Sequence, residues 1–262
     1  MEFLAGYVAL GLFAGFVAGL LGVGGGLIIV PILAWMLEQQ GLHQHAMHLA
    51  LGTSLASILF TSMSSLRAHH ARGAVDWETV KRISPGILLG TLVGATLAAR
   101  LSGTPLKLFF TAFLFYAAIQ MWWNFKPAAH RQLPGLMGMS TAGGVIGAVS
   151  SWVGIGGGTL SVPFQLWCNV PLHRAIGTSA AIGLPIALAG AVGYALGGPD
   201  EAIPGTIGFV HLTALACIAL GSISTAPLGA RAAHALPVGK LKRIFALLLF
   251  ALAVRMAWTL SW

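Results

Sequence analysis

The sequence predicts an all-α polytopic membrane protein built from two inverted repeats. Each repeat is expected to contain four long transmembrane helices plus one half-helix after a glycine-rich break. The first observation behind this prediction is the composition: 57% of the residues are hydrophobic, 8% are charged and the mean hydropathy is +0.86, whereas soluble domains carry about 25% charged residues. The second is a motif that occurs twice, and the third is an uneven distribution of basic residues between the loops.

Apolar runs of spanning length recur along the chain. A transmembrane helix needs roughly 17–25 mostly apolar residues. Eight runs meet this requirement, at residues 3–21, 49–66, 83–99, 108–125, 133–153, 175–197, 207–230 and 241–262. We therefore expect a single integral membrane domain over residues 1–262, located as a multi-pass protein in a bacterial plasma (inner) membrane.

Two glycine motifs interrupt this apolar pattern. GVGGGLIIVP begins at Gly22 and GIGGGTLSVP begins at Gly154, and six of the ten positions match. Glycine is a poor helix former, and irregular backbone inside a bilayer is tolerated only where protein buries it or where it lines a wet cavity. The apolar stretches that follow, residues 27–37 and 159–168, are too short to cross a bilayer. We therefore expect two half-helices, each starting at a glycine loop at membrane depth.

The duplication covers nearly the whole chain. HLALGTS at residues 48–54 and HRAIGTS at residues 173–179 match at five of seven positions. Further on, Gly94, Lys107 and Phe110 have equivalents 135 residues later in the chain. These matches predict a first repeat over residues 3–125, a second over 134–262 and a linker over 126–133.

The basic residues favour inverted over parallel repeats. If each glycine-containing stretch returns to the side on which it began, one side receives eleven basic residues and the other three; if each stretch crosses once, the split is seven to seven. The positive-inside rule expects a strong cytoplasmic excess, so inverted repeats with both termini outside are predicted. The eleven are Arg67, Arg72, Lys81, Arg82, Lys126, Arg131, Arg174, Arg231, Lys240, Lys242 and Arg243, and the three are Arg100, Lys107 and Arg255.

Broken helices related by inverted symmetry are the usual binding-site architecture of secondary transporters. The start of a half-helix presents free N–H groups and the positive end of the helix dipole, which suits an anion. The hydroxyls of the two GTS elements either donate to such an anion or cap helix starts. The candidate substrate-binding residues are Gly22, Gly24, Gly25, Gly26, Thr53, Ser54, Gly154, Gly156, Gly157, Gly158, Thr178 and Ser179.

His48 and His173 occupy equivalent positions in the two repeats. Their loops are predicted on opposite sides of the membrane, so the two imidazoles could act as symmetric gates or as proton carriers near neutral pH. A helix-start histidine that bonds to backbone explains the same positions. Both interpretations are left open here.

The two motif copies, each followed by an H-x-A-x-GTS element, resemble the sulfite exporter TauE/SafE family of membrane proteins. The resemblance spans the full chain. It implies a transporter of small sulfur-containing anions, such as sulfite or organosulfonates like sulfoacetate, in a bacterial plasma membrane. The chain departs from its own repeat at Thr159, where the first copy has Leu27, and in the histidine-rich loop before His48.

Two other classes of function are weighed against anion transport. His43, His45 and His48 have ligand-like spacing, which would suit a divalent metal transporter. An intramembrane serine hydrolase would need a serine paired with a histidine. Its candidates are Ser54, Ser179 or Ser140 with His211 or His234.

The expected partners are a small anionic substrate and the lipid bilayer, and a homodimer is left open. The net charge of +8 comes from residues in short loops, where basic residues set membrane orientation, so no nucleic-acid partner is predicted. All six acidic residues lie outside the apolar runs, which leaves a cation substrate without a counter-charge inside the membrane. We expect no catalytic residue, no resident metal and no cofactor.

Overall fold

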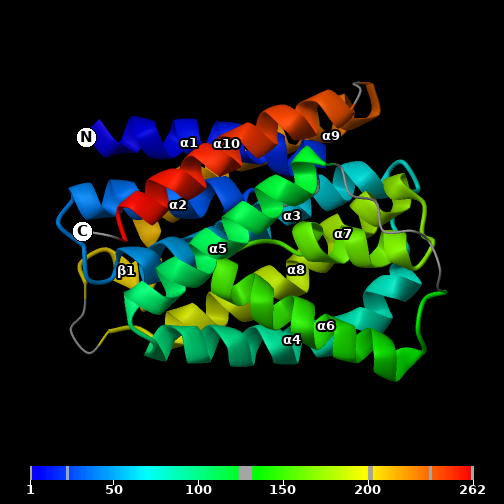
Figure 1. Cartoon of the computed structure of the whole chain (residues 1–262), viewed down its shortest axis with the longest axis horizontal. Helices are drawn as coiled ribbons and strands as arrows, with labels where there is room; N and C mark the ends of the chain where they lie inside the picture. Colours follow the sequence, from blue (N-terminus) through cyan, green and yellow to red (C-terminus); the bar gives the residue numbers. More distant parts are fainter. Residues whose placement is uncertain (1, 22–23, 124–131, 200–202, 236–237, 261–262) are drawn as a thin grey trace.

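The chain forms a bundle of helices (Figure 1), seen in a computed structural model that describes residues 2–21, 24–123, 132–199, 203–235 and 238–260. These residues form one short hairpin and ten helices. The strands β1 (Thr206–Ile207) and β2 (Val210–His211) pair antiparallel, with Thr206 opposite His211. The helices are α1 (Glu2–Leu21), α2 (Gly26–Gln39), α3 (Ala46–His70), α4 (Trp77–Arg100), α5 (Gly103–Trp122), α6 (Leu136–Val153), α7 (Gly158–Trp167), α8 (Leu172–Leu196), α9 (Leu212–Ala235) and α10 (Val238–Trp258).

Seven helices of the described chain are long and apolar enough to cross a membrane, namely α1, α3, α4, α5, α6, α8 and α9. Helix α10 is a further helix of 21 residues. The predicted helical membrane architecture is thereby confirmed. One predicted boundary is wrong, because the run expected from residue 207 begins with the hairpin and α9 starts at Leu212. Gly205 and Gly208 turn the backbone there with φ angles of 77° and 53°.

Two short helices occur where half-helices were predicted. Helix α2 has 14 residues and α7 has 10, which correspond to about 21 Å and 15 Å at 1.5 Å per residue. Neither length spans a hydrocarbon core of about 30 Å. Helix α2 ends at Gln39, two residues beyond the expected limit. Each short helix therefore begins inside the bundle and leaves its first N–H groups there.

The helices run along the long axis of the molecule (Figure 1). The start of α1, the end of α10 and the hairpin lie at the left-hand end, which we call the terminal end. The connection 71–76 and the α7–α8 connection lie at the right-hand end, which we call the far end. Helix α2 runs from the middle of the bundle to the terminal end, whereas α7 runs from the middle to the far end.

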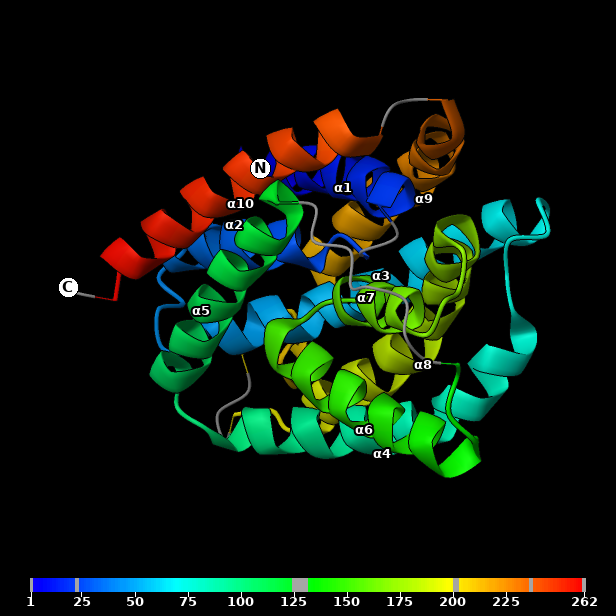
Figure 2. The same ribbon diagram turned by 45° about the vertical axis from the view of Figure 1, so that its right-hand side comes forward.

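Helices α3 and α8 form the centre of the bundle and pack against each other. In each of them 72% of the spanning residues are buried, against 39–50% in the other five spans. Around this pair, α1 packs along α9 and α4 packs along α6 (Figure 2). Glycines allow the close approach, since a Cβ on Gly19 would lie 1.9 Å from the Ala226 carbonyl oxygen and one on Gly86 would lie 1.7 Å from that of Ser140. Each of these outer pairs joins a helix of one predicted repeat to a helix of the other.

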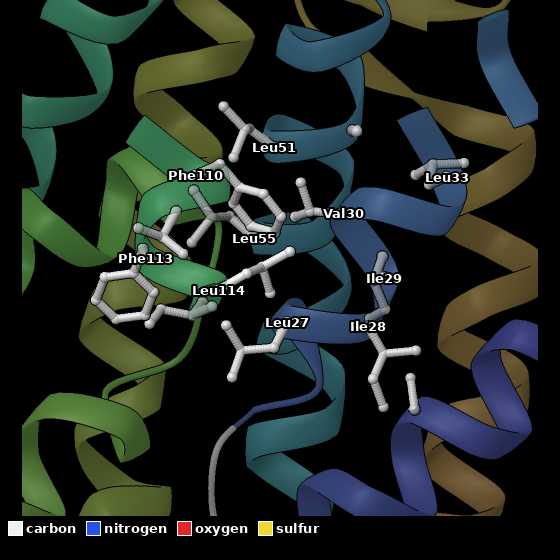
Figure 3. Packing of buried hydrophobic residues seen from close by; sticks show 14 of the residues in the cluster. Leu27, Ile28, Ile29, Val30, Leu33, Leu51, Leu55, Phe110, Phe113 and Leu114 are labelled. Atoms are coloured by element: carbon white, nitrogen blue, oxygen red, sulfur yellow. The ribbon is translucent and has the colours of Figure 1, made fainter. Parts of the chain in front are cut away.

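One part of the apolar core surrounds the buried face of α2, on the terminal side of the glycine loops. Figure 3 shows apolar side chains of α2, α3 and α5 that pack together. The labelled residues are Leu27, Ile28, Ile29, Val30 and Leu33 of α2, Leu51 and Leu55 of α3, and Phe110, Phe113 and Leu114 of α5. The face of α2 that these residues form is buried in hydrocarbon side chains, whereas Trp35, on another face, is 42% exposed.

Candidate functional site

The two glycine loops touch each other inside the bundle. Gly24, Gly25 and Gly154 have φ angles of 82°, 76° and 64°, a region that favours glycine. A Cβ on Gly24 would lie 2.9 Å from Gly156 Cα, and one on Gly26 would lie 2.1 Å from the Gly154 carbonyl oxygen. The close approach of two backbones therefore accounts for the repeated glycines. Gly22 lies outside the described residues.

The threonines of the two GTS elements brace the loops that lead into α4 and α9. Thr53 Oγ1 accepts the backbone N–H of His211 at 2.9 Å, and Thr178 Oγ1 accepts that of Asp76 at 2.9 Å. Both threonines are fully buried. Neither is among the residues that line the recess described below, so direct contact with an anion stays a prediction for them.

His211 and Asp76 in turn cap the helices that follow them. Asp76 Oδ1 accepts the backbone N–H of Glu78 at 3.1 Å, and His211 Nδ1 accepts that of Ala214 at 3.2 Å. Burial lowers the pKa of the His211 imidazole. The neutral ring keeps Nδ1 available as the acceptor in this cap.

This cap predicts a pH-dependent stability. Between about pH 6.5, where the unfolded chain takes up a proton, and the lower pKa of the folded chain, the unfolded state binds more protons than the folded state. Stability therefore falls as the pH drops below about 6.5. His211→Asn keeps a capping acceptor and removes the titration, so its melting temperature should drop less than that of the wild type between pH 7.5 and 5.5. His43→Asn, in an exposed loop, is the control expected to follow the wild type; an unchanged drop in His211→Asn would contradict the assignment.

The serines of the GTS elements lie against the glycine loops. Ser54 Oγ donates to the Gly154 carbonyl oxygen at 2.7 Å, which ties α3 to the glycine loop of the other repeat. Ser179, which is 1% exposed, lies in the wall of a small recess. The predicted site residues thus divide into a bracing group and a group that borders open space.

A small polar recess lies between the glycine loops, α3 and α8. Its internal volume is ≈ 10 Å³, which is about the space of one water molecule, so the recess is nearly closed in this conformation. Helix α7 starts at Gly158, and its N-cap residue, Gly157, supplies no side-chain acceptor. Because Gly157 lines the recess, the first backbone N–H groups of α7 lie at the recess. The lining residues are Ala18, Gly24, Thr61, Ser62, Ser65, Gly156, Gly157, Ser179, Ala180 and Gly183.

Three hydroxyl residues of this lining were not singled out from the sequence: Thr61, Ser62 and Ser65. Thr61 Oγ1 donates to Ser222 Oγ at 2.8 Å. The buried Ser65 Oγ has no hydrogen-bond partner among the described residues. The lining contains no charged side chain. Hydroxyls, glycine N–H groups and a helix start form a set of neutral donors, which can hold an anion without a counter-charge.

The two half-helices differ in polarity. With the glycine motifs aligned, Leu27, Ile29 and Leu33 of α2 correspond to Thr159, Ser161 and Gln165 of α7. All six side chains are buried. In the α7 set, Thr159 Oγ1, Ser161 Oγ and Gln165 Oε1 have no hydrogen-bond partner within the described part of the chain. Because α7 runs from the recess to the far end (Figure 1), these buried polar groups lie on the far-end side of the recess, although they do not line it.

The central helices show the same difference. With the GTS elements aligned, Thr61 and Ser65 of α3 correspond to Ile186 and Gly190 of α8. The second half of α3 runs to the far end, and the second half of α8 runs to the terminal end (Figure 1). At these aligned positions, the residues between the recess and the far end are polar, whereas their equivalents between the recess and the terminal end are apolar or glycine.

The repeat-related histidines lie at opposite ends of the bundle. His48 is buried at the terminal end, where its Nε2 lies 2.9 Å from the Leu101 carbonyl oxygen and its ring stacks on Phe209 at 4.7 Å. His173 is exposed in the first turn of α8, at the far end. Neither lines the recess, and their role as gates or proton carriers stays a prediction.

The histidine-rich loop is arranged around an aromatic ring. The His45 and His48 ring centroids are 6.3 Å apart, and both rings contact Phe209. Within the described residues no three His, Cys, Asp or Glu side chains are grouped so that they could hold a metal ion. The His45 and His48 imidazoles pack against Phe209 of the hairpin turn.

Comparison with known proteins decides the family. The profile of the family described as "Sulfite exporter TauE/SafE" matches residues 7–256. The chain belongs to the sulfite exporter TauE/SafE family. This TauE/SafE protein is a membrane transporter, and with its seven apolar spans it is a multi-pass protein of the bacterial inner membrane.

Several relatives of this TauE/SafE protein carry the name probable membrane transporter protein. The one from Haemophilus influenzae is 35% identical over 252 residues, with 94% of this chain and 95% of the relative covered. One from Xylella fastidiosa is 28% identical, with coverage of 95% and 92%. One from Bacillus subtilis is 25% identical, with coverage of 87% and 89%. No solved structure matches the chain.

Proposed function

We propose that this protein is a secondary transporter that moves a small sulfur-containing oxyanion, sulfite or an organosulfonate, by alternating access. The observation that carries the proposal is the uncharged recess at the start of α7, lined by hydroxyls and glycine backbone. An oxyanion matches these donors, whereas a metal ion would need carboxylate or imidazole ligands. The choice of a sulfur oxyanion rests on the family name.

The two repeats are proposed to be inverted, with the far end in the cytoplasm. In support, α1 starts at the terminal end and α6, its counterpart, starts at the far end (Figure 1). The brace from Thr53 to the start of α9 has its equivalent in the brace from Thr178 to the start of α4. Arg67, Arg72 and other residues of the basic set lie toward the far end. Rocking of two such halves around a central site is the usual route to alternating access.

The polar side chains of α7 and α3 support access to the recess from the far end. A buried hydroxyl or amide oxygen without a partner is costly in hydrocarbon, and water or substrate in a wider state of the path would satisfy Thr159, Ser161 and Gln165. The apolar packing around α2 in Figure 3 would form the closed side. In this proposal the described conformation is one stage of the cycle, with the terminal end as its closed side.

The hydrogen bonds of the candidate serines favour transport over an intramembrane hydrolase. Ser54 Oγ donates to the Gly154 carbonyl oxygen, and Ser140 Oγ donates to that of Arg82. The His211 ring accepts a backbone N–H in a helix cap. These three side chains form hydrogen bonds with backbone groups and not with one another. A serine nucleophile would instead need a histidine base within hydrogen-bond distance. His234 has no described side chain.

Ser65→Ala tests the proposed site with little risk to the fold, because no described group bonds to Ser65 Oγ. A hydrogen bond to a charged group contributes about 1.5–3 kcal/mol. The apparent KM for sulfite uptake into proteoliposomes should therefore rise about tenfold or more, with an unchanged melting temperature. Uptake of labelled sulfite, sulfoacetate and zinc would be measured side by side.

The neighbouring serine is the matched control. Ser64 is half-buried on another face of α3, and its hydroxyl donates to the Ile223 carbonyl oxygen at 3.2 Å. Ser64→Ala should therefore transport like the wild type. Equal sulfite kinetics in Ser65→Ala and Ser64→Ala would remove the recess from the substrate path. Uptake of zinc but of neither anion would replace anion transport by metal transport.

A further inference from the structure

A second cavity with a different lining lies between α3 and α9 at the far end. It is a groove with ≈ 1030 Å³ of empty space, including the part that opens outward. Three of its lining residues are Arg67, Arg72 and Arg231, and all three are exposed. The others are Phe60, Met63, Ser64, Ala68, Ala71, Ile223 and Pro227. The groove thus joins a cluster of guanidinium groups to an apolar wall.

Among the described residues, the three guanidinium groups have no acidic partner. The two ion pairs found in the described chain join Arg82 to Glu78 and Lys107 to Glu38. Arg67 contacts the sulfur of Met63 at 3.9 Å, and Arg72 donates to the Ala68 carbonyl oxygen at 3.3 Å. Three positive charges therefore border one groove with only weak or backbone acceptors, which leaves them available to a negatively charged ligand.

The apolar wall of the groove faces the surroundings of the bundle. Phe60 and Met63 are each 38% exposed and Ile223 is 40% exposed. In a membrane protein such side chains contact lipid tails. Phe60 lies seven residues before Arg67 on α3, so the wall reaches about 10 Å below the guanidinium level. The recess is lined by Thr61, Ser62 and Ser65, on another face of the same helix, so the groove is a separate site.

We propose that this groove binds an anionic phospholipid, with the headgroup phosphate held by Arg67, Arg72 and Arg231 and an acyl chain laid along Phe60, Met63 and Ile223. Basic pockets between transmembrane helices on the cytoplasmic side suit such headgroups. A free anion would match the guanidinium groups but leave the apolar wall without a ligand. A phospholipid matches both parts and lies in the plane where the groove opens. A lipid bound there would bridge α3 and α9.

Native mass spectrometry of the full-length protein in detergent tests the proposal, with dioleoylphosphatidylglycerol and dioleoylphosphatidylcholine added separately at equal concentrations. The wild type should retain phosphatidylglycerol preferentially. The triple variant Arg67→Gln, Arg72→Gln, Arg231→Gln should bind it at least about tenfold more weakly, because each basic residue near the headgroup contributes a severalfold factor. Binding of phosphatidylcholine should be the same in both proteins.

A control triple variant loses the same charge elsewhere at the far end: Lys81→Gln, Arg82→Gln, Arg174→Gln. It should retain phosphatidylglycerol like the wild type, and equal losses in both triple variants would overturn the proposal by showing a general charge effect. Phe60→Gln changes the apolar wall and leaves the three arginines in place. It should also weaken the binding of phosphatidylglycerol, so that misfolding of the arginine variant does not leave the proposal without a test. Competition by millimolar sulfate as strong as that by phosphatidylglycerol would show a free-anion site instead.

Discussion

Gly26→Ala is expected to destabilise the protein severely and to stop transport. The new methyl group would lie 2.1 Å from the Gly154 carbonyl oxygen and 2.9 Å from Ile155 Cα, and both are backbone atoms of the other glycine loop. Overpacking of a tight interior costs about 1–3 kcal/mol even where flexible side chains absorb it, and backbone cannot move aside as easily. Thermal melting followed by size-exclusion chromatography should show a melting temperature at least several degrees lower.

Other glycines of the chain provide the controls for this substitution. Gly135 has nothing within 4 Å of an added Cβ, and the nearest atom at Gly103 is 3.7 Å away. The free energy of unfolding of Gly135→Ala and of Gly103→Ala should therefore lie within about 0.5 kcal/mol of the wild-type value, as it does for most surface substitutions. If Gly26→Ala has the same melting temperature as these controls and transports sulfite normally, the close contact between the two loops is needed neither for stability nor for transport.

The two broken helices were predictable because they depend on a pattern that repeats, whereas the direct contact between their glycine loops was not predicted. Two copies of GxGGG, each followed by a stretch too short to span, define two broken helices in an apolar chain whatever their exact boundaries. The hairpin before α9 could not be predicted in the same way. Ile207, Phe209 and Val210 are as apolar as a span, and hydropathy does not register the turns at Gly205 and Gly208. The run therefore looked continuous with α9.

The role of the GTS threonines depends on partners far along the chain. Thr53 accepts the N–H of a residue 158 positions away, and Thr178 accepts that of a residue 102 positions away. Only the folded structure therefore shows that these hydroxyls bond to backbone, a role that the sequence could not distinguish from ligand binding. Thr61 and Ser65 were overlooked for another reason. Serine and threonine within transmembrane helices often bond to the preceding turn, and Thr61 also does so, to the Ser57 carbonyl oxygen. A hydroxyl every fourth residue at 57, 61 and 65 was the available signal.

The difference between the two half-helices leads to the second large expected effect. Thr159→Val, Ser161→Ala and Gln165→Leu together would give α7 the apolar character of α2 without adding volume. Stability should change little, because the removal of three buried oxygens without described partners offsets the loss of the two hydrogen bonds that Gln165 Nε2 donates to the Ser161 and Ala175 carbonyl oxygens. Sulfite uptake should fall at least about tenfold, since each donor lost to an anion is worth about 1.5–3 kcal/mol.

Thr91→Val separates a specific effect from a general one. Thr91 is fully buried on α4 and its Oγ1 also lacks a partner within the described residues, but it lies between α4 and α6 and not at the recess. This variant should keep wild-type uptake while showing a similar or higher melting temperature. A triple variant of α7 that transports like Thr91→Val would mean that the polar residues of α7 lie outside the path. Loss of uptake with stability retained would instead show that the polar residues of α7 are needed for transport. The two copies of a duplicated sequence would then have diverged in function: apolar α2 closes one side of the path, and polar α7 hydrates the other.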